Sequence, residues 1–374
     1  MNLVVLTNIL APYRVPLFDA MLREVKDFTV LLMAEREENR QWRVDPPKFR
    51  VEVLPGIHLR PPGADVSIHV NYGVMKALRR LDPDVVISGG FGPANLAAQW
   101  YCRRFGKKFV GWAHLTLQDG AHTFGIMRAI RRWMIQRSAG SIAESSEACE
   151  AFVHYGAKKD RVLTAVFSLD VNRIHQRVKA FHGTDGYKAL REKFSAPVLL
   201  SIGQAIERKG YHELFQIYEQ VIATRPTASL VLLGDGPLRA QYEELVRLKG
   251  WKNVHFLGFI QAEAMLPYLG AGDLFLFHTL YDPFGLVLSE AMAAELPVVS
   301  SIYASATRDL VEEGVTGYRI DPKRIDESAA IILKALSLSG DERAAMGRAA
   351  FERVKGSDAE EAGARIIRFC ESLP

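Results

Sequence analysis

Short apolar runs of strand-forming residues alternate with helical patterns from one end of the chain to the other. This alternation predicts parallel sheets with helices on both faces, in an α/β, doubly wound architecture. The length of 374 residues favours two such domains. The expected strands fall near residues 3–6, 28–33, 51–54, 85–88, 109–112, 140–143, 162–165, 198–202, 229–233, 254–257, 274–277, 297–300 and 318–320.

One polar stretch separates the two series of apolar runs. Residues 168–195 contain glycine and are rich in Lys, Arg and His, so we interpret them as a linker with a short helix. We therefore expect a first Rossmann-like domain over 1–180 and a second over 181–355. The remaining segment, 356–374, repeats its apolar residues on one helical face.

The composition is that of a soluble globular protein, with 48% hydrophobic and 24% charged residues. No apolar run approaches the roughly 18 residues needed to span a bilayer. The net charge of +4 is too small to indicate a nucleic-acid partner. The chain begins with an expected strand rather than a signal peptide, and its three cysteines lack metal-ligand spacing. A reducing cytoplasm is therefore the expected location.

The most informative motif lies at 280–293, where an apolar run ends in a turn at Asp282 and a helical pattern follows. A helix in this position points backbone N–H groups and its positive end at whatever lies above the strand, which suits a diphosphate. Asp282 and Glu290 would repel phosphates, but carboxylates accept hydrogen bonds from the hydroxyl groups of a ribose or a sugar. The alternative is that both acids only cap and solvate a strand–turn–helix unit.

This motif resembles the signature of retaining glycosyltransferases of family 4, in which two glutamates flank a Pro-Phe-Gly-Leu turn. Asp282 replaces the first glutamate here, and the rest of the motif is present. The resemblance extends over nearly the whole chain and implies the glycosyltransferase B fold, with the active site in a cleft and a final helix that returns to the first domain. It assigns the donor sugar to Asp282, the ribose to Glu290 and the diphosphate to the backbone around Phe284, Gly285 and Leu286.

A second part of the donor site is expected after the strand near 198–202, in a glycine-containing loop. Lys209 matches the family lysine that holds the donor diphosphate as a point charge. Gln204 stands where the family has arginine, so one bidentate phosphate contact is missing. The alternative is a solvated Glu-Arg-Lys turn. By the same resemblance Phe259 is expected at the edge of the base, with plain core packing as the alternative.

Three residues of the first domain are candidates because they follow expected strands. His114 matches a histidine that contacts the donor sugar in many family members, and with Asp282 it is the candidate catalytic residue. The alternative is that the His114 ring only forms hydrogen bonds with nearby backbone groups. Arg14 could meet a donor phosphate or an anionic acceptor, or could cap a neighbouring loop. Gly90 could let the backbone approach a ligand, or could only form a tight turn.

Two further positions depart from the family pattern. Glu295 replaces the glycine that usually ends the motif helix in the left-handed conformation, which implies a cost of roughly 1 kcal/mol or a different exit geometry. Ser305 and Ala306 replace a glycine pair, which narrows a loop that borders the donor sugar in relatives.

The segment 124–137 is basic and amphipathic. Its apolar positions suit packing against a parallel sheet, and they also suit the surface of an anionic membrane. Because several relatives act on lipid-linked acceptors, peripheral contact with the inner face of a membrane is a hypothesis.

As a whole, the resemblance predicts a hexosyltransferase that moves a sugar from a nucleotide-diphosphate sugar to a hydroxyl of a glycan or lipid-linked acceptor, in cell-surface polysaccharide or glycoconjugate synthesis. UDP is the expected nucleotide because members of the family usually use UDP-sugars, and GDP is the alternative. No cofactor is expected, and turnover should be metal-independent because no Asp-x-Asp accompanies the phosphate site. The alternatives are a nucleotide-sugar epimerase of the same fold and a non-catalytic glycosyltransferase-like partner protein. A dinucleotide dehydrogenase is disfavoured by the absence of the glycine fingerprint.

Overall fold

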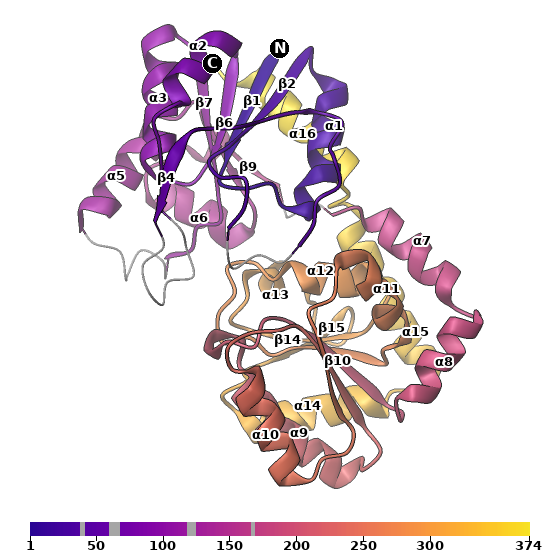
Figure 1. Ribbon diagram of the computed structural model, residues 1–374. Coiled ribbons are helices and arrows are strands. Elements are labelled where there is room, and N and C mark those ends of the chain that lie inside the picture. Colours follow the sequence, from indigo (N-terminus) through magenta and orange to yellow (C-terminus); the bar gives the residue numbers. More distant parts are fainter. Residues whose placement is uncertain (38–41, 60–67, 118–124, 166–168) are drawn as a thin grey trace. The chain divides into compact units, whose positions relative to one another are not determined.

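The computed structural model describes residues 1–37, 42–59, 68–117, 125–165 and 169–374. It divides into two compact units, one formed by Met1–Asp170 together with Ser357–Pro374, and one formed by Val171–Gly356. Each unit contains a parallel sheet between layers of helices (Figure 1). The α/β architecture expected from the alternation of strands and helices is confirmed.

The first unit is built on a seven-stranded sheet in the order β3–β2–β1–β6–β7–β8–β9. Its strands are β1 (Asn2–Thr7), β2 (Asp27–Leu32), β3 (Arg50–Val53), β6 (Val85–Gly89), β7 (Lys108–Ala113), β8 (Gly140–Ala143) and β9 (Val162–Thr164). Its helices are α1 (Val15–Glu24), α2 (Val74–Leu81), α3 (Pro93–Phe105), α5 (Gly125–Gln136), α6 (Ser146–His154) and α16 (Ala359–Ser372), with short 3-10 turns η1 (Pro12–Arg14) and η2 (Lys159–Arg161).

Both faces of this sheet are buried, which explains why its strands read as continuous apolar runs. Along β1, Leu3 and Val5 pack into a core shared with α1 and α16. Val4 and Leu6 point the other way, into a core shared with α2 and α3. Successive strand residues alternate between faces, so one strand supplies both cores.

The second unit has a six-stranded parallel sheet in the order β12–β11–β10–β13–β14–β15. Its strands are β10 (Val198–Ile202), β11 (Ser229–Leu233), β12 (Val254–Gly258), β13 (Leu274–Phe277), β14 (Val298–Ser301) and β15 (Gly317–Ile320). Its helices are α7 (Val171–Phe181), α8 (Asp185–Lys193), α9 (Tyr211–Thr224), α10 (Arg239–Lys249), α11 (Ala262–Ala271), α12 (Leu286–Ala293), α13 (Ser305–Leu310), α14 (Ile325–Ser337) and α15 (Gly340–Lys355), with the 3-10 turn η3 (Glu207–Lys209).

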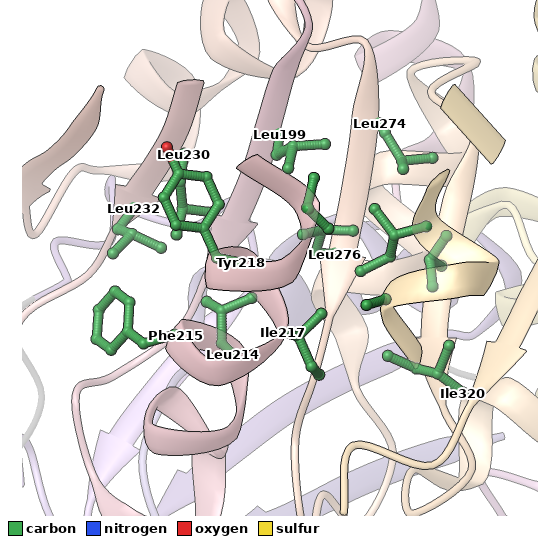
Figure 2. Close-up of a cluster of buried hydrophobic side chains, with 14 of the residues drawn as sticks. Leu199, Leu214, Phe215, Ile217, Tyr218, Leu230, Leu232, Leu274, Leu276 and Ile320 are labelled. Carbon is green, nitrogen blue, oxygen red and sulfur yellow. The ribbon is translucent and has the colours of Figure 1, made fainter. Parts of the chain in front are cut away.

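The core on one face of this sheet is formed by α9 and its neighbours. Figure 2 shows Phe215 and Tyr218 of α9 close to Leu230 and Leu232 of β11. All four side chains are at most 2% exposed. Burial of side chains this large stabilises the fold by about 1.5–3 kcal/mol each, so this layer holds the central strands in place.

The segment expected as a linker is instead two helices of the second unit. His182, just after α7, bonds the carbonyl of Gly270 at 2.9 Å, and Arg191 of α8 donates to Asp273 at 2.9 Å. The units therefore divide between residues 170 and 171 rather than at 180, because α7 and α8 pack on α11 of the second unit. Residue 168, where the linker was expected to begin, lies outside the described residues.

One hairpin was not expected from the sequence. The strands β4 (Gly56–Leu59) and β5 (Ile68–Asn71) pair antiparallel. Each has only four residues and an exposed face, so neither forms the apolar run that marks a buried strand.

The final helix belongs to the first unit, as expected. Ile366, Ile367 and Cys370 of α16 enter the same core as Phe18 and Met21 of α1. Close approach of the two helices depends on Gly363, because a Cβ built at this position would lie 2.7 Å from the Cβ of Ala20. Small residues at a helix–helix contact allow the backbones to come this near.

A Gly363→Ala substitution tests this contact. Alanine favours an isolated helix by about 1 kcal/mol relative to glycine, but here the added methyl group must push α16 away from α1. We expect a net loss of about 1–3 kcal/mol, measured as the change in the free energy of unfolding by urea titration. The matched control is Gly340→Ala in α15, where no atom lies within 4 Å of the new Cβ. Equal effects of the two substitutions would contradict this packing.

Candidate active site

The sheet of the second unit reverses its winding between β10 and β13. These two strands pair in parallel, with β11 and β12 on one side and β14 and β15 on the other. In open α/β sheets, ligands bind outside the carboxyl ends of the strands at such a reversal. The loops that follow β10 and β13 carry Lys209 and Asp282, so both residues lie at the position where a ligand is expected.

Lys209 and Asp282 form an ion pair. The Nζ of Lys209, at the end of η3, lies 2.5 Å from Oδ2 of Asp282. The two side chains are only 14% and 15% exposed, so water screens their attraction less than it screens a surface pair. A diphosphate at this position would have to compete with Asp282 for Lys209.

Backbone contacts hold Asp282 and the turn that follows it. Its Oδ1 accepts a hydrogen bond from the Phe284 N–H at 3.1 Å, and its own N–H donates to the Tyr303 carbonyl at 3.1 Å. Gly285 then takes a φ of 101°, where a Cβ would lie 2.4 Å from the Phe277 ring. Only glycine fits there, and α12 begins at the next residue, Leu286.

Glu290 lies in α12 and is half-buried. Burial raises the pKa of its carboxyl to about 7. Partners that donate hydrogen bonds to a buried carboxyl stabilise its ionised form and so lower its pKa again. The hydroxyl groups of a ribose are partners of this type.

Glycines bring the neighbouring loops of the second unit close together. A Cβ at Gly234, after β11, would lie 1.8 Å from the carbonyl oxygen of Gly203, after β10. Beside these loops, Gln204 is exposed and Phe259 is 40% exposed. Phe259 therefore lies outside the buried core, directly after the carboxyl end of β12.

His278 was not singled out in the sequence. It is 4% exposed and lies directly after β13, where one ring nitrogen bonds the Gly210 carbonyl at 3.0 Å and the other bonds the Ser201 hydroxyl at 2.9 Å. Burial lowers its pKa to about 4, so the ring is neutral near pH 7. His278 thereby fastens the loop that carries Lys209 to the end of β13.

In the first unit, a buried carboxylate joins two of the candidate residues. Glu144 follows β8, and its Oε1 accepts a hydrogen bond from Arg14 at 2.8 Å. Its Oε2 lies 2.5 Å from Nε2 of His114. Arg14 also stacks over the Trp112 ring, with its guanidinium carbon 4.1 Å from the ring centre. The structure thus gives Arg14 and His114 a shared side-chain partner, Glu144, directly after β8.

Gly90 lies near this group, after β6. It has a φ of 98° and its N–H donates to the Trp112 carbonyl at 3.3 Å. The side chain of Asn95 bonds the Gly89 carbonyl and the Gly92 N–H, which fastens the turn. The tight turn that the sequence left as one of two interpretations is therefore present.

Two family profiles match this chain. A family profile described as Glycosyltransferase Family 4 matches residues 22–164, and one described as Glycosyl transferases group 1 matches residues 188–353. The chain is a family 4 glycosyltransferase. Its two units carry the two profiles separately, so the relationship extends to both.

Individual relatives are distant. An uncharacterised glycosyltransferase of Methanocaldococcus jannaschii is 30% identical over 141 residues, 37% of this chain and 36% of that protein. A GDP-mannose-dependent monoacylated phosphatidylinositol monomannoside mannosyltransferase of Corynebacterium glutamicum is 28% identical over 191 residues, 48% of each. The chain thus aligns with less than half the length of these two curated relatives.

A solved structure shows the same fold. Anabaena HepE in complex with UDP is 20% identical, and the match covers 100% of both chains with a TM-score of 0.79. At this identity the likeness establishes the glycosyltransferase B fold and not the substrate.

The departures of this glycosyltransferase from the family pattern have visible structural effects. Glu295 keeps the left-handed conformation with a φ of 55°, so the expected backbone strain is present and the helix exit is not rebuilt. Its carboxylate lies 3.3 Å from Lys179. Ser305 and Ala306 are buried at the start of α13, where the Ala306 N–H donates to the Phe284 carbonyl at 2.9 Å.

Among the described residues, no three His, Cys, Asp or Glu side chains are grouped so that they could hold a metal ion. Within the same residues, no helix is long and apolar enough to cross a bilayer.

Asp282→Asn tests the ion pair at the winding reversal. The variant releases Lys209, so we expect UDP to bind more tightly by a factor of about five, equivalent to about 1 kcal/mol for a partly shielded pair. Isothermal titration of the purified chain with UDP measures the change. Glu207→Gln removes the same charge two residues from Lys209, where the glutamate is exposed, and should have a smaller effect. Weaker UDP binding by Asp282→Asn would contradict the competition.

Proposed function

We propose that this chain transfers a sugar from a nucleotide-diphosphate sugar to a hydroxyl of a glycan or lipid-linked acceptor, with retention at the anomeric carbon. The observation that carries the proposal is the ion pair of Lys209 and Asp282 at the winding reversal, shortly before α12, the helix that carries Glu290. A cation, a helix N-terminus and two hydrogen-bond acceptors match the diphosphate, the ribose and the sugar of such a donor.

Each residue then has a distinct role. Lys209 and the backbone N–H groups around Gly285 and Leu286 stabilise the charge that develops on the leaving diphosphate. Glu290 accepts hydrogen bonds from the ribose. Asp282, one methylene shorter than the usual glutamate, orients the sugar once Lys209 has turned to the phosphates.

Three further residues have roles proposed from the family resemblance. It assigns His114 to the donor sugar and Phe259 to the edge of the base. Gln204 cannot form the bidentate phosphate contact of an arginine, so donor binding relies more on Lys209.

UDP is the proposed nucleotide, and GDP is the alternative. Anabaena HepE was solved with UDP, whereas the Corynebacterium relative is named as dependent on GDP-mannose. The carboxylate of Glu290 serves either nucleotide, because both carry the same ribose.

Retention is proposed to follow a front-side path, in which the leaving phosphate accepts the proton of the attacking hydroxyl. Asp282 and Glu290 are both engaged in binding roles, so neither is assigned as a covalent nucleophile of the kind used in double displacement. Detection of a trapped glycosyl-enzyme would contradict this path. Turnover is proposed to be metal-independent, and activity lost with EDTA and restored by manganese would contradict that.

Nucleotide binding by wild type and Glu290→Gln tests the proposed donor site. Thermal shifts with UDP, GDP and ADP identify the base, since a ligand at a hundred times its Kd adds about 2.7 kcal/mol. We expect one nucleotide to stabilise wild type, and Glu290→Gln to lose most of the shift. Glu352→Gln, on an exposed face of α15, is the control. No shift with any nucleotide would favour the non-catalytic alternative.

The same experiment has an expected pH dependence. Because the pKa of Glu290 is about 7 in the folded chain, the carboxyl becomes protonated as the pH falls from 8 to 6. Nucleotide affinity should fall over that interval, and the fall should be smaller in Glu290→Gln, where only the terminal phosphate of the nucleotide titrates. Without ligand the sign is opposite: a raised pKa stabilises the folded state at low pH, and this stabilisation is lost as the pH rises through about 7.

Peripheral membrane contact through α5 is also proposed. Only Met134 and Ile135 of this helix are buried, whereas Ile126 is 71% and Trp133 is 37% exposed, next to the exposed Arg128. Packing against the sheet thus explains only the C-terminal part of the helix. Phe124, which opened the expected segment, lies outside the described residues.

Cosedimentation with vesicles rich in phosphatidylglycerol tests this contact. We expect binding at low salt that weakens as salt rises, because surface charges are screened. Arg128→Glu should reduce binding several-fold, and Lys252→Glu, an exposed lysine of the second unit, should change it little. No sedimentation of wild type at low salt would overturn the proposal.

A further inference from the structure

A cavity of about 350 Å³ lies at the amino-terminal edge of the sheet of the first unit. Among its lining residues, Lys107 directly precedes β7, and Ser138 and Ala139 directly precede β8. The candidate residue His114 follows β7 at the opposite, carboxyl-terminal edge of the same sheet. The cavity is therefore separate from the candidate active site, and its volume is in the range of pockets that hold small molecules.

The walls of this cavity are basic. They carry Arg103 of α3, Lys107, Arg137 just after α5, and Arg161 of η2. Among the described residues, no Asp or Glu side chain lines the cavity, and the only carboxylate paired with any of the four cations is Asp82, 2.8 Å from Lys107. Pro374 also lines the cavity and forms no ion pair with the four within the same residues. Like charges around one cavity repel one another, so its walls favour an anion.

Gln99 of α3 lines the same cavity and has an unsatisfied polar atom. The residue is 2% exposed, and its Nε2 donates to the Met134 carbonyl at 2.7 Å, which fixes the orientation of the amide. Its Oε1 is then buried without a hydrogen-bond partner among the described residues. An unsatisfied buried acceptor costs free energy, and a ligand hydroxyl that reaches it would supply the missing donor.

We propose that this cavity binds a phosphate ester whose organic part carries a hydroxyl group. Guanidinium groups donate paired hydrogen bonds to phosphate oxygens, and Arg103, Arg137 and Arg161 reach the cavity from three different elements. The ring of Trp133 holds one of them, because the guanidinium carbon of Arg137 lies 5.0 Å from its centre. Small soluble phosphate esters and the headgroup of phosphatidylglycerol share this chemistry. The site does not depend on the proposed transferase function.

Isothermal titration of the whole chain with glycerol 3-phosphate tests the site. We expect Arg103→Gln to weaken binding about tenfold, because it removes a charge-assisted hydrogen bond. The matched control is Arg104→Gln, the next residue of α3, which is exposed and does not line the cavity, and it should change the affinity little. Equal weakening by the two substitutions would overturn the proposal.

Arg161→Gln makes the same test from a different element. This residue lies in η2, so its loss should weaken glycerol 3-phosphate binding as the loss of Arg103 does. If Arg103→Gln does not fold, Arg161→Gln decides. Glycerol, which has the hydroxyl groups without the phosphate, should not bind, and glycerol binding as tight as that of glycerol 3-phosphate would overturn the proposal.

Cosedimentation with phosphatidylglycerol vesicles distinguishes the two sources of the phosphate. Because α5 is itself proposed to contact such vesicles, the informative comparison is between the two arginine variants. Weaker vesicle binding by Arg103→Gln but not by Arg104→Gln would support the lipid headgroup as the ligand. Equal vesicle binding by the two variants, together with the expected loss of glycerol 3-phosphate affinity in Arg103→Gln, would support a soluble ester. Equal vesicle binding and no binding of glycerol 3-phosphate by wild type would overturn the proposal.

Discussion

β10 and β13 pair in parallel, and this pairing decides which side chains meet in the second unit. Leu199 lies opposite Leu274, and the loops after both strands emerge next to each other at the carboxyl edge. Lys209 and Asp282, separated by 73 positions in the sequence, are brought to 2.5 Å by it. His278, directly after β13, also connects the two loops. Its ring bonds the Gly210 carbonyl in the loop after β10 and the Ser201 hydroxyl within β10. The meeting of Lys209 and Asp282 thus depends on a strand contact that contains no polar side chain.

Much of this arrangement could be predicted from the sequence, because strands buried on both faces read as continuous apolar runs. Every expected strand is present within a residue or two. The loop glycines and the turn at Asp282 identified the ends of strands, where parallel sheets place their ligands. Lys209, Asp282 and Glu290 could therefore be assigned to one edge without coordinates.

Other features could not be predicted, and the reasons are physical. Glu144 lies 130 positions from Arg14, and no local periodicity reports a contact that distant. A glutamate within an apolar stretch, directly after a strand, was the only signal available. The helices α7 and α8 have polar, mostly exposed surfaces that resemble a linker in composition. The strands β4 and β5 have only four residues each, and the buried positions of β5 are the polar His69 and Asn71, so neither strand forms the apolar run that identifies a strand.

The return of α16 to the first unit has a consequence for synthesis on the ribosome. The core that α1 shares with α16 cannot close until α16 has been translated, whereas the second unit is continuous in sequence. At 5–20 residues per second, α1 is translated on the order of ten seconds or more before α16, because the second unit is made between them. Phe18 and Met21 of α1 would be exposed in that interval, so the nascent first unit is a natural client for a chaperone.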